Sequence, residues 1–472
     1  MMVDRVNADI CVLGAGSGGL SVAAGAAQLG ARTVLIERAK MGGDCLNHGC
    51  VPSKSLIAAA YRAHVVRSSS AFGIEAMEPR VDMASVRRHI HRVIAAIEPH
   101  DSAERFEGLG VQVIREHGRF VGEREVVAGN HRIRARRFVI ATGSRAAIPP
   151  VPGLESVDIL TNETVFDLDT LPGHLLILGA GPIGCELAQA FHRLGSAVTM
   201  VDIGPMLARD DGDMRRVVRE SLIGDGVAIR DSVKVERVEQ GPSIVIRDGN
   251  GIGRIEGTHL LVAAGRVPNI EDLGLDAAGI EYDRRGVTVD GRLRTTRKTI
   301  FAIGDVTGRW QFTHVAGHQA GIVIRNALFR LPARMREDAI PRVTYTDPEL
   351  AHVGLSEEEA REKGIVCEIL HSPFAENDRA RAEGAVEGGI KLVATRKGKV
   401  LGATIVGAHA GELILPWVMA IEQDMKLSKL ASMLVPYPTL SEIGKRVAGS
   451  FYTPRLFNAR TRMLVRWLAR LG

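Results

Sequence analysis

Two copies of one glycine pattern constrain the fold of this chain more than any other feature. The first copy, ADICVLGAGSGGLSVAAGAAQLGARTVLIER, contains Gly14-x-Gly16-x-x-Gly19. An apolar run precedes the glycines, an alanine-rich stretch follows them, and a second apolar run ends at Glu37. This order predicts a strand, a tight turn, a helix and a second parallel strand, which is the βαβ arrangement that binds a dinucleotide.

The second copy, LLILGAGPIGCELAQAFHRLGSAVTMVD, contains Gly179-x-Gly181-x-x-Gly184 and ends at Asp202. In both copies the acid lies 18 residues after the third glycine, at 37 after 19 and at 202 after 184. The first glycine permits the turn, the second lets backbone N–H groups approach a pyrophosphate, the third allows close packing, and the acid accepts from ribose hydroxyls. We therefore predict two Rossmann-like domains and two dinucleotides.

One of the two dinucleotides should be a nicotinamide cofactor. Asp202 favours a free ribose 2′-hydroxyl and repels a 2′-phosphate, which favours NADH over NADPH. Arg209, seven residues further on, opposes that preference. We therefore predict NAD(P)H as the cofactor, with NADH favoured over NADPH.

Composition excludes several classes of protein. A chain of 472 residues is too long for one hydrophobic core, so several domains are expected. The formal net charge of +5 arises in the segment 455–470, which holds five arginines and no acid, so a nucleic-acid-binding surface is not indicated. No apolar run reaches the roughly 18 residues of a membrane helix, and no secretion signal is apparent. Five scattered cysteines favour a reducing, cytoplasmic setting.

The stretch GGDCLNHGC at 42–50, followed by VPSKSL, places Cys45 and Cys50 directly after the first βαβ unit. In a reducing compartment a close cysteine pair is more often catalytic than structural. Pro52 suits the first turn of a helix. Cys50 would then lie at the positive end of that helix, which favours the thiolate.

With this motif in place, the whole chain resembles the FAD-dependent pyridine nucleotide–disulfide oxidoreductases, which include dihydrolipoamide dehydrogenase, glutathione reductase and mercuric reductase. Further signatures follow in the family's order: VIATGS at 139–144, GRVPN at 265–269 and FAIGD at 301–305. The resemblance implies an α/β fold with two Rossmann-like dinucleotide-binding domains, for FAD and NAD, and a C-terminal α+β dimerisation domain. The expected FAD-binding domain is split between 1–146 and 271–340, the NAD(P)-binding domain covers 147–270, the dimerisation domain covers 341–454, and 455–472 form a basic amphipathic tail. Within the first part we expect a helical excursion near 81–106 and strands at 111–120 and 125–133.

The resemblance also implies roles for individual residues. Cys50 would face the flavin, Cys45 would exchange with the substrate, and Lys54 would lie near flavin N5 and pair with Glu186. His314 would be a positioning group beside the flavin. The residues expected to bind the cofactors are Gly14, Gly16, Gly19, Glu37, Gly43, Thr142, Gly143, Asp305 and His314 for FAD, and Gly179, Gly181, Gly184, Asp202 and Gly265 for the nicotinamide half. No resident metal site is expected.

The chain departs from the family pattern at the expected acid–base residue. Thiol reductases of the family carry His-Pro-Thr-x-x-Glu near the C-terminus, whereas this chain has Tyr437-Pro-Thr-x-x-Glu442. A tyrosine with an ordinary pKa of about 10 is a poor base at neutral pH. Mercuric reductases have a tyrosine in this place, but this sequence shows no cysteine pair ahead of Cys11 or at its end. His48, between the two cysteines, is a substitute acid–base group, a metal ligand beside Cys45, or a solvent-facing loop residue.

We therefore predict a homodimeric flavoenzyme that passes electrons from NAD(P)H through FAD to Cys45–Cys50 and on to a small-molecule or protein disulfide, or to a thiophilic acceptor. Three alternatives stay open: a mercuric-reductase-like or other metal-ion reductase, a quinone reductase or pyridine-nucleotide transferase that does not use the dithiol, and a non-catalytic redox component. The tail 455–472 alternates apolar residues with arginines at helical spacing. It either packs on the dimer or makes peripheral contact with an anionic inner-membrane face or an acidic partner.

Overall fold

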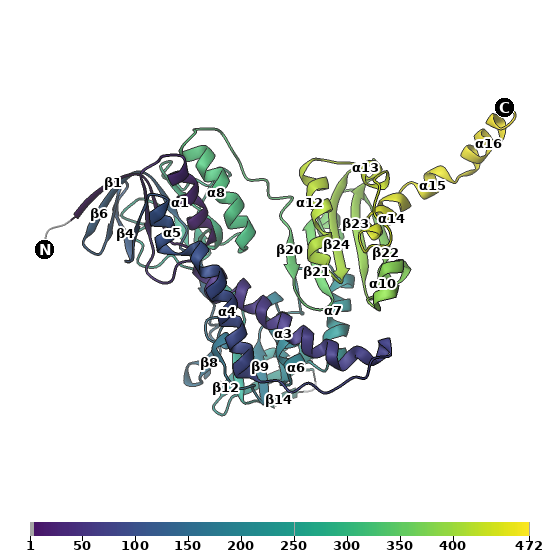
Figure 1. Cartoon of the computed structure of the whole chain (residues 1–472), viewed down its shortest axis with the longest axis horizontal. Helices are drawn as coiled ribbons and strands as arrows, with labels where there is room; N and C mark the ends of the chain where they lie inside the picture. Colours follow the sequence, from purple (N-terminus) through teal and green to yellow (C-terminus); the bar gives the residue numbers. More distant parts are fainter. Residues whose placement is uncertain (1–3, 250, 472) are drawn as a thin grey trace. The chain divides into compact units, whose positions relative to one another are not determined.

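The computed structural model describes residues 4–249 and 251–471, whose contacts group them into two compact units (Figure 1). Unit 1 contains the described parts of 1–203 and 228–335, and unit 2 contains those of 204–227 and 336–472. The segment 204–227 therefore groups with the C-terminal unit, although it lies inside the stretch 147–270 that we assigned to one domain. The four-part domain division stays a prediction.

The first sheet of unit 1 contains the first glycine turn. Its strand order is β3-β2-β1-β6-β5-β4, with β19 on β6. Strands β1, β2, β3, β6 and β19 are parallel to one another, and the apolar run at the end of β1 is buried, as is usual in a parallel sheet. The strands are β1 (Asp4–Leu13), β2 (Thr33–Ile36), β3 (Val111–Ile114), β4 (Gly118–Gly122), β5 (Glu125–Ala128), β6 (His131–Ile140) and β19 (Ile300–Ala302).

The prediction of continuous strands at 111–120 and 125–133 was wrong. The first is broken between Ile114 and Gly118, so that β3 pairs in parallel with β2 while β4 pairs antiparallel with β5. The second is broken at Gly129, where a positive φ of 55° starts a tight turn between β5 and β6. Polar residues at 115–117 and a glycine turn end these strands where an apolar pattern alone suggested continuity.

Helices of unit 1 pack against one another, and two of them carry the redox motif. Helix α1 follows the first glycine turn and packs against α8, and α3 packs against both α4 and α6. The helical excursion predicted near 81–106 is α4 and α5. The helices are α1 (Ser17–Gln28), α2 (Gly43–Asn47), α3 (Cys50–Ser68), α4 (Met83–Asp101), α5 (Ala103–Gly108), α6 (Pro182–Leu194) and α8 (Thr313–Ala327), with 3-10 turns η1 (Ser69–Phe72) and η4 (Gly304–Thr307).

A second parallel sheet in unit 1 contains the second glycine turn. Its order is β11-β10-β9-β15-β8, and β12, β13 and β14 form a separate antiparallel sheet. The strands are β8 (Ile159–Leu160), β9 (His174–Leu178), β10 (Ala197–Val201), β11 (Ala228–Arg230), β12 (Lys234–Glu239), β13 (Ser243–Asp248), β14 (Gly251–Glu256) and β15 (His259–Val262). Two short antiparallel pairs complete the unit: β7 (Ser144–Ala146) with β16 (Arg266–Pro268), and β17 (Tyr282–Asp283) with β18 (Gly286–Val287). Both predicted βαβ units are present.

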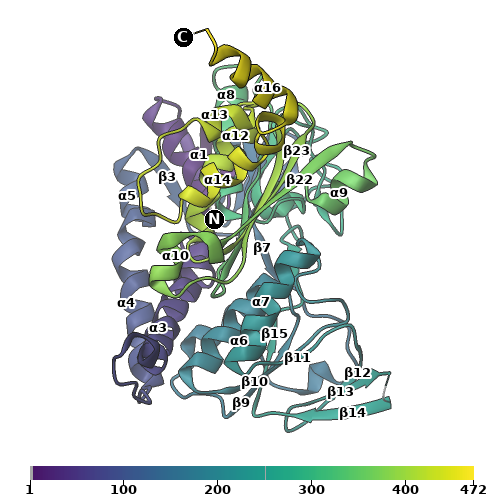
Figure 2. The ribbon, with the colours of Figure 1, turned by 90° about the vertical axis from the view of Figure 1, so that its right-hand side faces the viewer.

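Unit 2 is built on an antiparallel sheet of order β20-β21-β24-β23-β22, whose strands are labelled in Figure 1. Figure 2 shows β22 and β23 of this sheet from another side. Helix α12 packs on β24, α14 packs on β22 and β23, and α7 packs on β21 and β24. The strands are β20 (Arg342–Thr344), β21 (Glu349–Gly354), β22 (Cys367–Pro373), β23 (Gly389–Thr395) and β24 (Val400–Gly407). The helices are α7 (Gly212–Asp225), α9 (Glu357–Glu362), α10 (Asp378–Glu383), α11 (Ala410–Leu413), α12 (Leu415–Glu422), α13 (Leu427–Ala431), α14 (Glu442–Ser450), α15 (Thr453–Leu456) and α16 (Ala459–Leu468). This is the α+β architecture expected for the C-terminal domain.

Candidate active site

The first glycine turn has the shape that a dinucleotide pyrophosphate requires. Gly14 has φ +103°, and a Cβ there would lie 2.3 Å from the Ala141 carbonyl oxygen. A Cβ on Gly19 would lie 1.9 Å from the Gly14 oxygen, so helix and strand pack through glycine. At Gly16 a Cβ would meet no atom within 4 Å, which leaves the helix N-terminus open to a ligand. Gly43 of the redox motif approaches this open turn, since its Cβ would lie 2.7 Å from the Gly16 Cα.

The second glycine turn repeats this geometry. Gly179 and Gly184 are packed against backbone oxygens, and a Cβ on Gly181 would again meet open space. Asp202, directly after β10, accepts a hydrogen bond from the Ala180 N–H at 2.6 Å. Glu37 of the first copy likewise accepts from the Ala15 N–H at 2.6 Å. Each acid is therefore held at the turn where a cofactor ribose would lie, and the residues present fit both FAD and a nicotinamide dinucleotide.

The two cysteines of the redox motif are free thiols on consecutive helices. Cys45 lies within α2 and is half-buried, and Cys50 is the first residue of α3. Cys50 Sγ lies 3.5 Å from Thr313 Oγ1, at the start of α8. A hydrogen bond from Cys45 lowers the pKa of Cys50, assisted by Thr313 and by the charge of Lys54, while burial opposes the shift. The same hydrogen bond raises the pKa of Cys45, so Cys50 is the thiolate of the pair.

Lys54 and Glu186 are brought together by α3 and α6. Lys54 Nζ donates to Glu186 Oε2 at 2.7 Å. The Glu186 side chain is 7% exposed and the Lys54 side chain is 37% exposed. A buried carboxylate is energetically costly without a positively charged partner, and Lys54 supplies that charge to Glu186. One turn along α3 from Cys50, this pair puts a cation beside the thiolate.

The predicted flavin motifs meet through residues that sequence reasoning had not singled out. Ser144 Oγ donates to Asp305 Oδ2 at 2.5 Å, and Arg266 Nε donates to Ser144 Oγ at 2.7 Å. Burial raises the pKa of Asp305, and the Ser144 hydrogen bond and the Arg266 charge oppose that shift. Arg266 could have been found from its place in GRVPN, whereas Ser144 carries no signal beyond its position beside Thr142 and Gly143.

Thr142 and Gly143 are joined to the other end of GRVPN. Thr142 Oγ1 donates to the Asn269 carbonyl oxygen at 2.7 Å, and the Asn269 N–H donates to the Gly143 oxygen at 2.9 Å. Gly265, directly before β16, has φ +114°. These hydrogen bonds join the segment VIATGS, where the chain leaves the first sheet, to the segment GRVPN, where it returns.

Two predicted histidines lie beside the cysteines in different ways. His314 is the second residue of α8, next to Thr313, and its ring stacks on Phe312 with centroids 5.4 Å apart. His48 ends α2, and its carbonyl oxygen accepts from Asn162 Nδ2 at 3.1 Å. The backbone of His48 is therefore fixed, and its half-buried side chain remains beside the cysteine loop.

Tyr437 belongs to unit 2 and does not bind the glutamate that the family pattern suggests. Its hydroxyl donates to Asp378 Oδ2 at 3.1 Å, and its side chain is 70% exposed. The hydrogen bond and the charge of Asp378 raise the pKa of Tyr437. Glu442 begins α14, where its Oε2 accepts from the Thr439 N–H at 3.4 Å. Sequence reasoning missed Asp378, because nothing in its local sequence marks it.

Comparison with known proteins places the chain in a family. Residues 8–320 match the pyridine nucleotide-disulphide oxidoreductase family, and residues 340–448 match the dimerisation domain of that family. The chain belongs to the pyridine nucleotide-disulphide oxidoreductases. The predicted fold class and the FAD and NAD(P)H cofactors are thereby confirmed, and the dimerisation domain supports a homodimer.

Relatives of this oxidoreductase include both enzyme types that the sequence suggested. A mercuric reductase of Bacillus cereus is 35% identical over 440 residues, which cover 92% of this chain and 70% of that protein. A dihydrolipoyl dehydrogenase of Thermus scotoductus is 34% identical over 444 residues, covering 92% and 95%. Among solved structures, the Cu(II) complex of the HOCl-induced flavoprotein disulfide reductase RclA from Escherichia coli is 27% identical with a TM-score of 0.83, covering 93% of this chain and 99% of that one. The prediction of a flavoprotein oxidoreductase acting on a sulfur group is confirmed.

Within residues 4–249 and 251–471, no helix combines the length and apolarity that crossing a membrane requires. No group of three or more His, Cys, Asp or Glu residues in the same ranges is placed to hold a metal ion.

Proposed function

We propose that this oxidoreductase uses NADH, through FAD and the Cys45–Cys50 pair, to reduce a soft metal ion in preference to a disulfide. The observation that carries the proposal is the hydrogen bond from Tyr437 to Asp378. A phenol is already protonated at neutral pH, and the hydrogen bond to Asp378 raises the pKa of Tyr437 further. A protonated phenol cannot take the thiol proton during disulfide exchange, whereas thiolates bind soft metal ions without a base.

The relatives support this choice of acceptor. Several of the most similar proteins are named mercuric reductases, and RclA has been solved as a Cu(II) complex. We infer that in the homodimer Tyr437 of the partner subunit faces Cys45. There its hydroxyl would orient an incoming ion beside Cys45, and it would not carry a proton.

Each residue of the site then has a physical task. The two glycine turns present backbone N–H groups to the pyrophosphates, and Glu37 and Asp202 are placed to meet the riboses. Bound FAD would supply the two-electron chemistry that links the nicotinamide to the thiols. Lys54, held by Glu186, keeps a positive charge beside the Cys50 thiolate. Cys45, whose pKa is raised, is the protonated thiol of the pair, and it would release its proton to water when a soft metal ion binds the sulfur.

The test is a screen of NADH oxidation by the purified holoenzyme with Hg(II), Cu(II), glutathione disulfide and oxidised lipoamide. We expect metal-dependent oxidation in the wild type that Cys45→Ser removes. We expect disulfide activity to rise at least tenfold in Tyr437→His, because an imidazole titrates near neutral pH. Fast disulfide turnover by the wild type, unchanged by Tyr437→His, would contradict the proposal.

A second candidate keeps a disulfide as substrate and makes His48 the acid–base group. It is favoured by the position of His48 between the cysteines, on a backbone fixed by Asn162. His48→Ala would then slow reoxidation of the reduced enzyme by a disulfide far more than reduction by NADH. Equal effects on both half-reactions would leave His48 as a loop residue.

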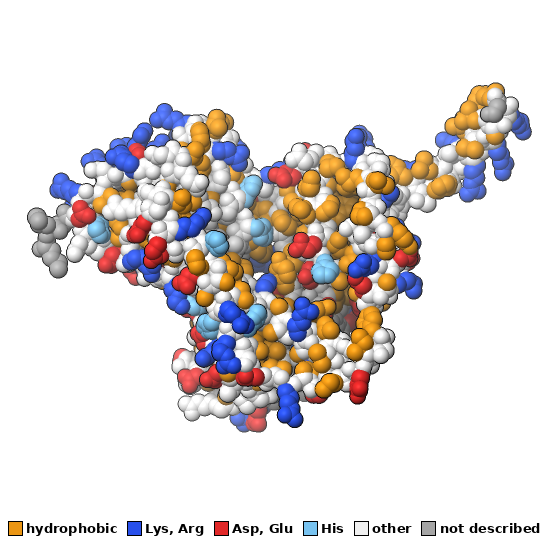
Figure 3. Space-filling model, in the orientation of Figure 1, with side chains coloured by type: hydrophobic (Ala, Val, Ile, Leu, Met, Phe, Trp, Pro, Cys, Tyr) orange, Lys and Arg blue, Asp and Glu red, His pale blue; other side chains and the backbone are white. Residues whose placement is uncertain are grey.

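We also propose that the C-terminal tail binds an anionic membrane surface. The helix α16 has no buried residue. Met463, Trp467 and Leu471 follow one another every four residues beside Leu464 and Leu468, and all five are exposed. Arg462, Arg466 and Arg470 repeat with the same spacing along the other side, as Figure 3 shows in blue against orange. A helix with one apolar and one basic face lies in the interface of anionic bilayers, where each arginine contributes about 1 kcal/mol.

The tail proposal is tested by deleting residues 459–472. This deletion retains Arg455, which anchors the preceding turn through Glu368 at 2.6 Å. The full chain should sediment with phosphatidylglycerol vesicles and not with phosphatidylcholine vesicles, and the deletion should abolish sedimentation. If the deletion instead dissociates the dimer, and the full chain sediments with neither kind of vesicle, the tail belongs to the dimer interface.

A further inference from the structure

Asp44, the residue before Cys45, is held by two side chains that come from distant parts of unit 1. Its Oδ1 accepts from Asn162 Nδ2 at 3.0 Å. Its Oδ2 lies 3.0 Å from Arg266 Nη2. The same Asn162 amide donates to the His48 carbonyl oxygen at 3.1 Å. Asn162 thus bridges the first turn and the end of α2, the helix that carries Cys45.

Neither of these side chains is a loose surface group. Asn162 is 8% exposed and follows β8 in the turn before the second glycine motif. The Arg266 side chain is 13% exposed and begins β16. Arg266 also donates from Nη2 to the Ser144 carbonyl oxygen at 3.0 Å and lies 3.7 Å from Asp305. One guanidinium therefore ties the redox loop to the residues that the flavin motif contributes.

The position of Asp44 gives these contacts a consequence for the cysteines. A disulfide forms only when the two Cα atoms lie within roughly 4.4–6.8 Å in a narrow range of orientations. Cys50 is fixed by the start of a long helix, α3. Cys45 lies on the short helix α2, which has few residues of its own to hold it. The geometry of the pair consequently depends on what holds α2 in place.

We propose that Asn162 and Arg266 are positioning residues that hold α2 through Asp44 and thereby set the equilibrium between the Cys45–Cys50 dithiol and its disulfide. The inference rests on the proposed role of this pair as the electron relay. A held α2 keeps Cys45 close to Cys50, which raises the effective concentration of one thiol at the other and favours the disulfide. Removing the contacts lets α2 move and favours the dithiol.

The experiment equilibrates the FAD-loaded holoenzyme anaerobically in mixtures of reduced and oxidised dithiothreitol. The enzyme dithiol gives two electrons and two protons to one oxidised dithiothreitol, which opens to its own dithiol while the Cys45–Cys50 bond forms. Acid quenching, alkylation and mass spectrometry then count the two states without measuring turnover. We expect Asn162→Leu to lower the equilibrium constant for disulfide formation by about tenfold, or about 30 mV.

Arg145 offers a matched control. It lies on β7, the strand that pairs with β16, and it binds Glu271 at 2.8 Å on the surface. Arg145→Met should leave the constant unchanged. Asn162→Ser, which removes the amide without adding volume, replaces the leucine variant if that variant does not retain flavin. The positioning role is wrong if Asn162→Leu, or Asn162→Ser in its place, matches Arg145→Met.

A double-mutant cycle tests whether Arg266 acts through Asp44. The change in the constant caused by Arg266→Met in the wild type should shrink to less than a third in the Asp44→Asn background. An effect of equal size in both backgrounds would overturn this part of the inference. A wild type that forms no Cys45–Cys50 disulfide in any mixture would instead refute the proposed relay itself, so the two failures are distinguishable.

Discussion

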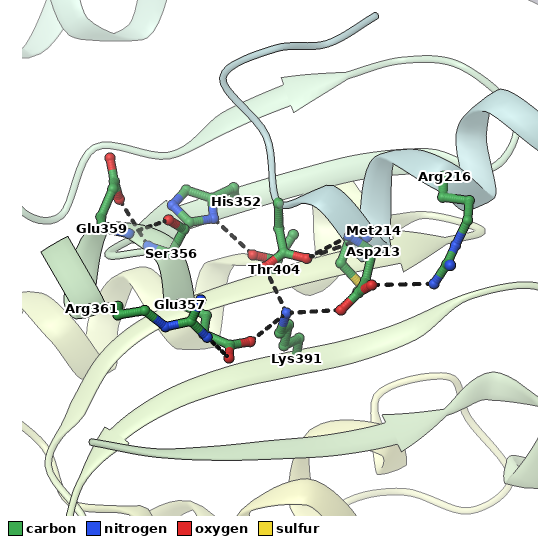
Figure 4. Close-up of polar contacts among 11 residues, drawn as sticks. Asp213, Met214, Arg216, His352, Ser356, Glu357, Glu359, Arg361, Lys391 and Thr404 are labelled. Atoms are coloured by element: carbon green, nitrogen blue, oxygen red, sulfur yellow. Dashed lines mark hydrogen bonds and ion pairs between the residues drawn. The ribbon is translucent and has the colours of Figure 1, made fainter. Parts of the chain in front are cut away.

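The buried lysine of unit 2 gives the sharpest stability prediction. Lys391 Nζ lies 2.8 Å from Asp211 Oδ2, 2.8 Å from Glu357 Oε2 and 3.3 Å from Asp213 Oδ2 (Figure 4). The side chains of Lys391 and Asp211 are only 5% and 2% exposed. Lys391 on β23 thus fastens the N-terminus of α7 to the sheet, and the Lys391→Met variant removes the charge while keeping most of the volume.

The expected loss of unfolding free energy depends on which carboxylate is left without a positively charged partner. Removing one member of a buried ion pair costs about 3–5 kcal/mol, since the other charge stays desolvated. Asp211 keeps its capping bonds from the N–H groups of Asp213 and Met214 at 3.1 and 3.3 Å, which puts the cost at the lower end. Asp213 is 61% exposed and adds little. We expect about 3 kcal/mol, which corresponds to a roughly 150-fold larger equilibrium constant for the opening of α7 and β23.

Amide hydrogen exchange of α7 and β23, followed by mass spectrometry, measures this opening. Lys399→Met is the matched control, because Lys399 pairs at 2.8 Å with Asp424 on the surface and should cost less than about 1 kcal/mol. Asp211→Asn combined with Lys391→Met should recover most of the loss. If Lys391→Met exchanges no faster than Lys399→Met, the buried pair does not hold α7.

The pH dependence of the Lys391 pair has a definite sign. Burial alone would lower the pKa of Lys391, but the hydrogen bonds that its ammonium group donates to Asp211 and Glu357 raise it above its usual range. A lysine whose pKa is higher in the folded state stabilises fully below the ordinary value of about 10.4 and loses that contribution only as the pH rises through the folded value. The exchange difference between wild type and Lys391→Met should therefore stay constant from pH 6 to pH 9.

Three further outcomes are expected. Burial lowers the pKa of His352 to about 4, so unit 2 should lose about 3 kcal/mol of unfolding free energy as the pH falls from about 6.5 to 4, and His352→Asn should flatten that dependence in urea titrations. Glu186→Gln should remove the carboxylate that Lys54 binds and slow reduction of the enzyme by NADH at least tenfold in stopped-flow absorbance, while Glu163→Gln, on the surface, should not. Gly43→Ala should reduce bound flavin, measured by its absorbance after denaturation, because its Cβ would lie 2.7 Å from the Gly16 Cα.

The parts of the fold that the sequence predicted are those encoded by neighbouring residues. Both glycine turns, the strands that flank them and the helix that begins at Cys50 follow from patterns a few residues long, and the structure contains them all. Where two short strands meet at a turn, the apolar pattern does not mark the break, and the strand predicted at 111–120 was wrong for that reason. The predicted pairing of Lys54 with Glu186 depended on the family resemblance, since 132 residues separate them.

The contacts of Tyr437 and of the helix that carries Cys45 could not be predicted from short sequence motifs. Asp378 binds Tyr437 from 59 residues away, and Asn162 binds Asp44 from 118 residues away. Neither residue lies in a motif. Each has an ordinary polar side chain, and its contact with its partner forms only when folding brings the two residues together. In the proposed mechanism, the short motifs place the cofactors and Cys50, whereas isolated long-range pairs adjust the pKa of Tyr437 and the placement of Cys45. Acceptor choice should therefore respond to substitutions at Asp378 and Asn162.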